Sequence, residues 1–328
     1  MKKRIFSGMQ PTGDLHIGNY LGALKTWARM QYDYEPIFCI VDQHAITVYQ
    51  DPAELQRKTE DVAALYVASG IDPRHAAIFV QSTVPAHVEL AWVFTCITPF
   101  GWLNRMTQFK AKSGQQDSVG TGLLCYPALM AADILLYQAA IVPVGEDQAQ
   151  HLELTRDISQ RFNTLYGETF VVPETRLPVV GARIMGLDEP AEKMSKSAPG
   201  ANHAVGLLDP PNRIRKLISR AVTDSKPGVD FEDPGAGVRN LLNVYQAFAE
   251  VTNGEMKEKF AGMRYGDLKK TVAEMIVSHL EPIQKKFEEL TADRDVIRGI
   301  LKEGAERVTP IAQATMDLVR ERTGLYRG

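Results

Sequence analysis

The stretch FSGMQPTGDLHIGNYLG, residues 6–22, lies between a short apolar run and a segment with helical periodicity. It contains four glycines, which are Gly8, Gly13, Gly18 and Gly22. Glycines in such a turn let the backbone approach a flat or anionic ligand, and the following helix presents unpaired N–H groups at its start. The stretch lacks both the G-x-G-x-x-G fingerprint and the G-K-[ST] ending of a P-loop. It predicts a strand, a ligand-binding turn and a helix, in which His16 and Asn19 either contact the ligand or only cap the helix.

The sequence around this stretch alternates strand-like and helix-like segments. Buried strands are expected at residues 4–8, 36–47, 75–82 and 139–148, and helices at 17–31, 52–70 and 127–138, the last opening at Pro127. Repeated strand, crossover helix and strand units form a parallel sheet with helices on both faces. We therefore predict an α/β fold with a Rossmann-like parallel-sheet domain, in which ligands bind at the carboxyl ends of the strands.

The sequence beyond about residue 205 has a different pattern. An apolar stripe with helical spacing consists of Val272, Met275, Ile276, His279, Leu280 and Ile283, and Phe287 and Leu290 extend it. Pro282 should kink or interrupt this helix. We expect a parallel-sheet domain at residues 1–190, a loop or linker at 191–204, and an all-helical domain at 205–328 whose last helix packs back on the first domain.

The composition excludes several classes of protein. The 328 residues are 45% hydrophobic, enough for a large core, and the formal net charge of −3 argues against a basic nucleic-acid coat. Cys39, Cys96 and Cys125 are widely spaced in apolar surroundings, so we expect buried thiols rather than a disulfide framework or a metal site. No apolar run has the length of a signal peptide or approaches the about 20 residues of a membrane span. We therefore expect a cytoplasmic protein that does not bind membranes.

Three polar segments could carry chemistry or could be structural. PAEKMSKSAPG, residues 190–200, has no apolar period, so it is either a solvated linker or a mobile cationic loop. Gly145, Glu146, Asp147 and Gln148 follow a predicted strand; the carboxylates either cap a helix or bind the hydroxyls of a ribose.

The third candidate is a single charged side chain within an apolar segment. Asp133 lies in the apolar segment MAADILLYQ, residues 130–138, where an unpaired carboxylate is costly. Its partner is either another protein group or a ligand with one donor, such as an indole N–H.

Several of these segments together resemble a known family. DLHIGN, residues 14–19, resembles the first signature of class I aminoacyl-tRNA synthetases, and KMSKS, residues 193–197, is their second signature. With MAADILLYQ, VPVGEDQ at 142–148 and IVDQHAIT at 40–47, nearly the whole chain is similar to the bacterial tryptophanyl-tRNA synthetases. The order of both signatures around a parallel-sheet region makes the resemblance specific.

The resemblance implies two sets of site residues. ATP would contact Gln10, Pro11, Thr12, Gly18, Asn19, Gly145, Glu146, Asp147, Ile184, Lys193, Met194, Ser195, Lys196 and Ser197, with Lys110 and Lys112 as additional phosphate contacts. Among these positions and the adjacent turn, His16, Asn19, Lys193 and Lys196 would carry catalysis, and residues 193–197 would form a loop that closes over ATP. Tryptophan would be held by Asp133, Phe6, His44, Tyr126, Met130 and Gln148, with Asp133 accepting the indole N–H.

The resemblance also implies the reaction and its partners. L-Tryptophan would react with ATP, assisted by Mg²⁺, to form tryptophanyl-adenylate and pyrophosphate, and the tryptophanyl group would then pass to the 3′ end of tRNA-Trp. No resident metal is expected, the helical domain would read the anticodon, and the protein would be a homodimer. Two positions depart from a simple match: Asn19 ends the first signature, and Trp102 stands where relatives often have Glu.

Three alternatives are weighed against this interpretation. A tyrosyl-tRNA synthetase would bind a phenol, which both donates and accepts and so needs more polar groups than the single one in MAADILLYQ. A nucleotidyltransferase without a tRNA partner would lack the KMSKS loop and the helical region. A catalytically silent paralogue that binds RNA or protein would not need both lysines of the second signature.

Overall fold

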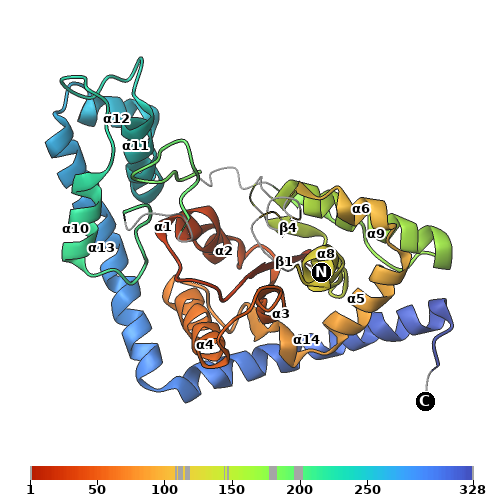
Figure 1. The fold of residues 1–328 in the computed structure, drawn as a ribbon. Helices are drawn as coiled ribbons and strands as arrows, with labels where there is room; N and C mark the ends of the chain where they lie inside the picture. Colours follow the sequence, from red (N-terminus) through yellow and green to blue (C-terminus); the bar gives the residue numbers. More distant parts are fainter. Residues whose placement is uncertain are drawn as a thin grey trace.

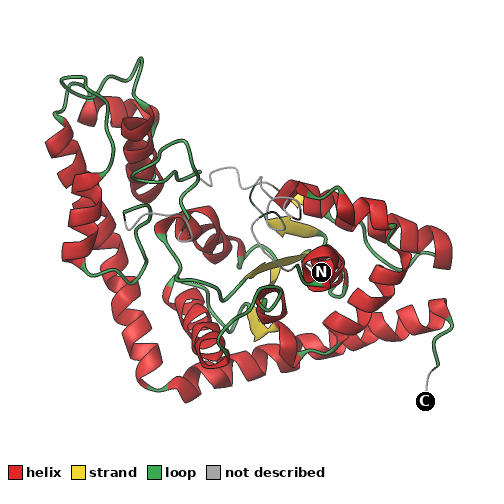
Figure 2. Ribbon diagram, viewed as in Figure 1, coloured by secondary structure: helices red, strands yellow, loops and turns green. Residues whose placement is uncertain are grey.

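The computed structural model describes residues 2–107, 109, 114, 119–143, 145, 148–176, 183–195 and 202–326. Its centre is a five-stranded sheet in the order β3-β2-β1-β4-β5, and every neighbouring pair of strands is parallel (Figure 2). The strands are β1 (Arg4–Met9), β2 (Glu35–Ile40), β3 (Ala77–Val80), β4 (Ile141–Pro143) and β5 (Glu174–Arg176). Chain order reverses at β1, which pairs with β2 on one side and β4 on the other, so the ligand-binding edge lies at the carboxyl end of β1.

Successive residues of each strand face opposite sides of the sheet, as the two-residue period of a strand requires. Ile5, Phe38 and Ile78 belong to one buried apolar cluster, whereas their chain neighbours Phe6 and Phe79 belong to a second. The first cluster continues into helices near both ends of the chain, and the second into the helices between β3 and β5 and the last helix. The prediction of a parallel sheet covered by helices on both faces is therefore confirmed.

The helices of the sheet region include the three segments expected from the sequence and further helices that were not expected. They are α1 (Ile17–Asn19), a π-helical turn η1 (Tyr20–Leu24), α2 (Lys25–Met30), α3 (Asp42–Ala45), α4 (Pro52–Ala68), a 3₁₀ turn η2 (Gln81–Thr83), α5 (Ala86–Ile97), α6 (Phe100–Asn104), α8 (Thr121–Leu135) and α9 (Ala149–Tyr166). Helices α1, η1 and α2 follow one another directly, so they form the single helical segment expected from the periodicity.

Several local expectations were wrong. Strand β2 ends at Ile40, and residues 42–45 form α3 instead of continuing the strand. Pro127 does not open α8 but lies inside it, where its ring removes one backbone hydrogen bond. Strand β5 was not expected, because its sequence ETR has no apolar run. Cys96 is exposed, whereas Cys39 is buried and Cys125 is half-buried.

The C-terminal region is helical, as expected. It contains α10 (Pro211–Arg220), α11 (Ala236–Ala249), α12 (Asn253–Phe260), α13 (Tyr265–Ala292) and α14 (Arg294–Thr323). The predicted stripe on α13 is buried at Val272, Ile276, Leu280 and Ile283. Helix α13 continues past Pro282 to its end, so the expected interruption is absent from this described helix.

The last helix lies directly against the parallel sheet. Helix α14 runs along the lower edge of the molecule beneath α4 and α5 (Figure 1). A Cβ atom at Gly304 of this helix would lie 1.9 Å from the carbonyl oxygen of Ile78 on β3, so only glycine fits there. Arg294 also pairs with Glu60 and Asp61 of α4. The domain boundaries at 190 and 204 remain a prediction.

Candidate functional site

The turn after β1 carries the glycine-rich stretch at the carboxyl edge of the sheet. A Cβ atom at Gly8 would lie 2.9 Å from a methyl group of Val41, and Gly13 has a φ of +66°. At the start of α1, the backbone N–H of His16 donates to the side chain of Asn19 at 3.0 Å. His16 is therefore the N-cap residue of α1, which was one of the two roles predicted for it. Its ring is buried, and 8% of the residue is exposed.

The His16 ring is buried without its charge. Burial, followed by the positive charges of Lys193 and His203, lowers the pKa of His16 to about 4. Its Nδ1 atom has no hydrogen-bond partner among the described residues. A Cβ atom at Gly18 would lie 2.9 Å from the ring, which therefore packs directly on this glycine. At neutral pH the ring is an uncharged polar group in a region of positive charge.

The base of the KMSKS segment lies beside this turn. The Ile17 N–H donates to the Val205 carbonyl at 2.9 Å, and the Leu207 N–H donates to the Leu15 carbonyl at 2.8 Å. Across the same region, the Met194 N–H donates to the Ile184 carbonyl at 2.9 Å. Residues that are far apart in the sequence are therefore joined by backbone hydrogen bonds.

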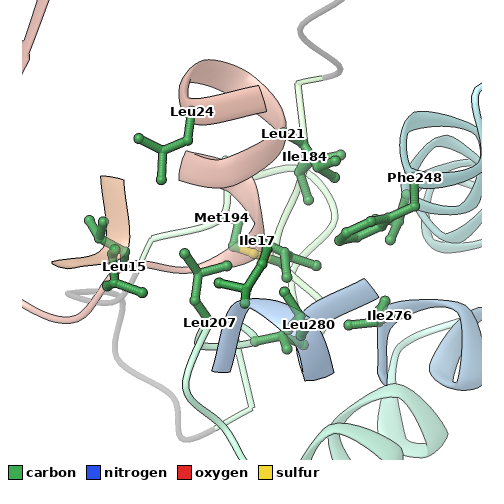
Figure 3. Packing of buried hydrophobic residues seen from close by; sticks show 14 of the residues in the cluster. Leu15, Ile17, Leu21, Leu24, Ile184, Met194, Leu207, Phe248, Ile276 and Leu280 are labelled. Atoms are coloured by element: carbon green, nitrogen blue, oxygen red, sulfur yellow. The ribbon is translucent and has the colours of Figure 1, made fainter. Parts of the chain in front are cut away.

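Side chains reinforce this junction. Figure 3 shows Met194 and Ile184 packed with Ile17 and Leu21, in a cluster that also includes residues of α13. Met194 is 2% exposed, so it anchors the segment in the core. Lys193 pairs with Met185 in an isolated antiparallel bridge. That residues 193–197 form a mobile loop stays a prediction.

A second polar cluster is centred on Asp133 of α8. The Oδ2 atom of Asp133 lies 2.7 Å from Nε2 of His44 on α3. Its Oδ1 atom lies 2.6 Å from Nε2 of Gln81 and 2.7 Å from Nδ1 of His87. Nε2 of His87 lies 2.7 Å from the hydroxyl of Tyr137. These groups converge from α3, η2, α5 and the end of α8, next to the carboxyl ends of β2 and β3.

The charge of Asp133 and the tautomers of His44 and His87 follow from the hydrogen bonds between them. Burial by itself raises the pKa of Asp133, but the interactions with His44 and then His87 outweigh it, so the pKa lies below its usual value. An ionised carboxylate only accepts hydrogen bonds, so His44 donates from Nε2 and His87 from Nδ1. The Tyr137 hydroxyl then donates to Nε2 of His87.

Asp133 therefore has protein partners, which was one of the two alternatives left open by the sequence. Gln81 and His87 were not predicted as partners of Asp133. The only pattern in the sequence that could have indicated them is the occurrence of polar residues after a buried strand. The cluster also weakens one argument against a tyrosine substrate, because the tertiary structure brings more than one polar group to Asp133. Oδ1 accepts two hydrogen bonds and Oδ2 accepts one among the described residues, which leaves acceptor capacity mainly on Oδ2.

The other predicted tryptophan contacts surround this cluster. Phe6 stacks on Tyr137 with ring centroids 5.7 Å apart, and Tyr126 meets His44 edge-on at 6.0 Å. The Tyr126 hydroxyl lies 2.6 Å from Nε2 of His151, and burial raises the pKa of Tyr126 to about 12. Met130 is half-buried and packs against the same core as Phe6.

The remaining predicted residues fall into two groups. Those that the structure describes at the carboxyl edge are Gln10, Pro11, Thr12 and Gly145, together with Gln148 at the start of α9. Glu146, Asp147, Lys196, Ser197, Lys110 and Lys112 lie outside the described residues. Trp102 is half-buried on α6 against the second apolar cluster. Among the described residues, no group of three or more His, Cys, Asp or Glu side chains could hold a metal ion.

Known proteins resemble this chain over nearly its full length. The family model described as class I tRNA synthetases (W and Y) matches residues 1–281. Curated relatives include the tryptophan–tRNA ligase of Caldanaerobacter subterraneus subsp. tengcongensis, 52% identical over 324 residues and 98% of each chain. Another is the tryptophan–tRNA ligase of Bacillus subtilis, 48% identical over 328 residues, covering 100% of this chain and 99% of the relative.

Solved structures show the same relationship. The tryptophanyl-tRNA synthetase of Mycoplasma pneumoniae has a TM-score of 0.92 and 35% identity, with 99% of both chains covered. The enzyme of Campylobacter jejuni, solved in complex with ADP and tryptophan, has a TM-score of 0.85 and 34% identity, covering 98% of this chain and 100% of the other. A tyrosyl-tRNA synthetase from Aeropyrum pernix has a TM-score of 0.71 at 20% identity, which shows a shared fold alone.

Proposed function

Because the chain belongs to the tryptophan–tRNA ligases, a family of class I tRNA synthetases, we propose that it activates L-tryptophan with ATP and charges tRNA-Trp. The tryptophan carboxylate attacks the α-phosphorus of ATP, giving tryptophanyl-adenylate and pyrophosphate. The terminal adenosine of the tRNA then takes the tryptophanyl group. The observation that carries the proposal is that His16, in the turn after β1, bridges to Gly206 and lies within the influence of the Lys193 charge.

ATP binds, in this proposal, between the turn at residues 10–19 and the segment that begins at Lys193. The neutral His16 ring faces the phosphates without requiring another buried charge. The lysines of residues 193–197 stabilise negative charge as it develops on the leaving pyrophosphate, where stabilisation raises the rate. Mg²⁺ enters with the phosphates of ATP.

Tryptophan binds beside the Asp133 cluster. The ligand of the C. jejuni neighbour supports this amino acid, and the enclosing rings of Phe6 and Tyr126 suit a large aromatic side chain. Oδ2 of Asp133 accepts the indole N–H, since Oδ1 already accepts from Gln81 and His87. A carboxylate has no hydrogen to donate, so it cannot satisfy a phenol hydroxyl that accepts a hydrogen bond.

A homodimer is supported by an exposed apolar patch on α5 and α6. Trp92 and Phe100 are 69% and 67% exposed, and Val88 lies one helical turn from Trp92 at 46%. Exposed apolar patches of this kind mark protein–protein contacts.

The helical region beyond residue 205 reads the tRNA anticodon in this proposal, and the enzyme acts in the cytoplasm together with its tRNA. None of the described helices is long and apolar enough to pass through a bilayer.

One assay tests the proposal against its alternatives. Exchange of labelled pyrophosphate into ATP should depend on tryptophan and should be far weaker with tyrosine. Exchange with tyrosine alone would reassign the substrate, and no exchange with any amino acid would support a silent paralogue. Charging of tRNA-Trp, measured separately, distinguishes a synthetase from a nucleotidyltransferase without a tRNA partner.

A further inference from the structure

His203 lies between the two signature segments and is not part of either. It is 3% exposed and belongs to the short segment that ends in the hydrogen bonds to the turn before α1. Its Nδ1 atom lies 2.7 Å from Oδ1 of Asp188, and its Nε2 atom lies 3.2 Å from the carbonyl oxygen of Lys193. The His203 carbonyl in turn accepts from the Leu187 N–H at 3.0 Å. One buried ring therefore joins three stretches of chain.

Both partners of the His203 ring accept hydrogen bonds and neither donates through these atoms. A carboxylate oxygen and a backbone carbonyl have no hydrogen to give, so the ring nitrogen is the donor in each of these hydrogen bonds. The contact with Asp188, at 2.7 Å, is the shorter of the two. The charge of His203 is also one of the causes that keep the nearby His16 neutral.

The backbone beneath the ring is shaped to admit it. A Cβ atom at Gly186 would lie 2.2 Å from Cε1 of His203 and 2.6 Å from its Nδ1. Any other residue at position 186 would displace the ring from both partners. The Gly186 N–H donates to the Glu192 carbonyl at 2.8 Å, so this glycine also belongs to the base of the KMSKS segment. Gly186, Asp188 and His203 form one unit, which we name the loop-base clamp.

We infer that His203 is a positioning residue for ATP activation, which acts by holding the carbonyl of Lys193 and so fixing the backbone that carries this lysine. The inference rests on the proposed role of Lys193 at ATP. Met194 packs in the apolar core, but packing alone does not set the direction of the neighbouring backbone carbonyl. A lysine whose backbone is already held loses less conformational freedom when it meets the transition state, which favours the transition state more than the initial binding of ATP.

Two substitutions of similar size separate the two hydrogen bonds of the ring. In His203→Gln, the amide nitrogen can take the place of Nε2 and donate to Lys193. In His203→Asn, it can take the place of Nδ1 and donate only to Asp188. The assay is tryptophan-dependent pyrophosphate exchange, with kcat and the KM for ATP measured separately. We expect kcat to fall about tenfold in His203→Asn, as for the loss of one hydrogen bond to a buried carbonyl, and less than threefold in His203→Gln.

Control variants make the result decisive. His75→Asn changes an exposed histidine and should leave both parameters unchanged. Gly186→Ala should lower kcat at least as much as His203→Asn, because it displaces the same ring from both partners. Thermal unfolding of each variant shows whether it is folded, and a variant that unfolds at the assay temperature is measured at a lower one.

Two outcomes would overturn the inference. Equal loss of kcat in His203→Gln and His203→Asn would show that the hydrogen bond to Lys193 carries no effect. A change in the KM for ATP without a change in kcat would show a role in ground-state binding instead of positioning. A wild-type protein without tryptophan-dependent exchange would instead refute the proposed function, so the two failures are distinguishable.

Discussion

Asp133 and His16 are both buried titratable groups with a lowered pKa, yet the two environments have opposite consequences. Around Asp133, donors from three elements keep the carboxylate charged in the core. Around His16, burial and nearby positive charges keep the imidazole uncharged. The first region is fixed by bonds between side chains, and the second by backbone bonds between distant segments. In the proposed site, the amino-acid end is therefore held by hydrogen bonds between side chains, and the phosphate end by backbone hydrogen bonds.

Removing the carboxylate should have the largest effect. Asp133→Ala leaves the donors of His44, Gln81 and His87 buried without an acceptor, so the free energy of unfolding should fall by about 3–5 kcal/mol. The KM for tryptophan should rise about a hundredfold, as for the loss of a hydrogen bond to a charged group, while the KM for ATP changes little. Urea unfolding and exchange kinetics measure both effects. An unchanged KM for tryptophan would remove Asp133 from the amino-acid pocket, and Asp133→Asn tests charge at nearly constant volume.

At the phosphate end of the proposed site, we expect loss of a lysine to lower kcat and to leave the affinity for ATP nearly unchanged. Lys196→Ala removes a cation that meets charge only as pyrophosphate leaves, so kcat should fall by about 10²–10³-fold with little change in the KM for ATP. Single-turnover and steady-state exchange measurements separate these parameters. Lys302→Ala, at an exposed position of α14, is the matched control. An effect on the KM for ATP alone would contradict stabilisation of the transition state.

The pH dependence of stability should distinguish the two groups. His16 binds its proton less readily when folded, because its pKa of about 4 lies below the 6.5 of an ordinary histidine. Its contribution to stability is therefore complete above pH 6.5 and is lost as the pH falls towards 4. The loss should be about 3 kcal/mol. The contribution of Asp133 has the same sign but is lost only below its ordinary pKa of 3.8. Denaturant unfolding from pH 7 to pH 4 should show the loss in wild type and a smaller one in His16→Gln, and identical profiles would contradict this assignment.

The smallest effect is expected at the edge of the Asp133 cluster. Tyr137→Phe removes the hydroxyl that donates to His87, so the tautomer that donates to Asp133 is no longer enforced. The loss of one neutral hydrogen bond costs about 1 kcal/mol, and the KM for tryptophan should rise about fivefold. The KM for ATP should stay constant. A larger effect on ATP than on tryptophan would show that the two regions are coupled.

Local patterns in the sequence predicted the larger elements well. The apolar strands β1 to β3, the helix after the glycine turn and the stripe on α13 were all expected, because burial imposes periods of two or about 3.6 residues. Strand β5 and the position of Pro127 within α8 were not expected. A three-residue strand has too few residues to show a period, and a proline is compatible with several positions near the start of a helix.

The sequence by itself determined the parallel sheet, the helical C-terminal region and the two signature segments, since each depends on residues that are close together in the chain. Only the tertiary structure decided which groups meet: His87 and Gln81 with Asp133, His203 with the carbonyl of Lys193, and the turn before α1 with residues 205–207. The physical reason is that a hydrogen bond depends on distance and direction in space. No local period encodes a contact between side chains or carbonyls that come from different elements.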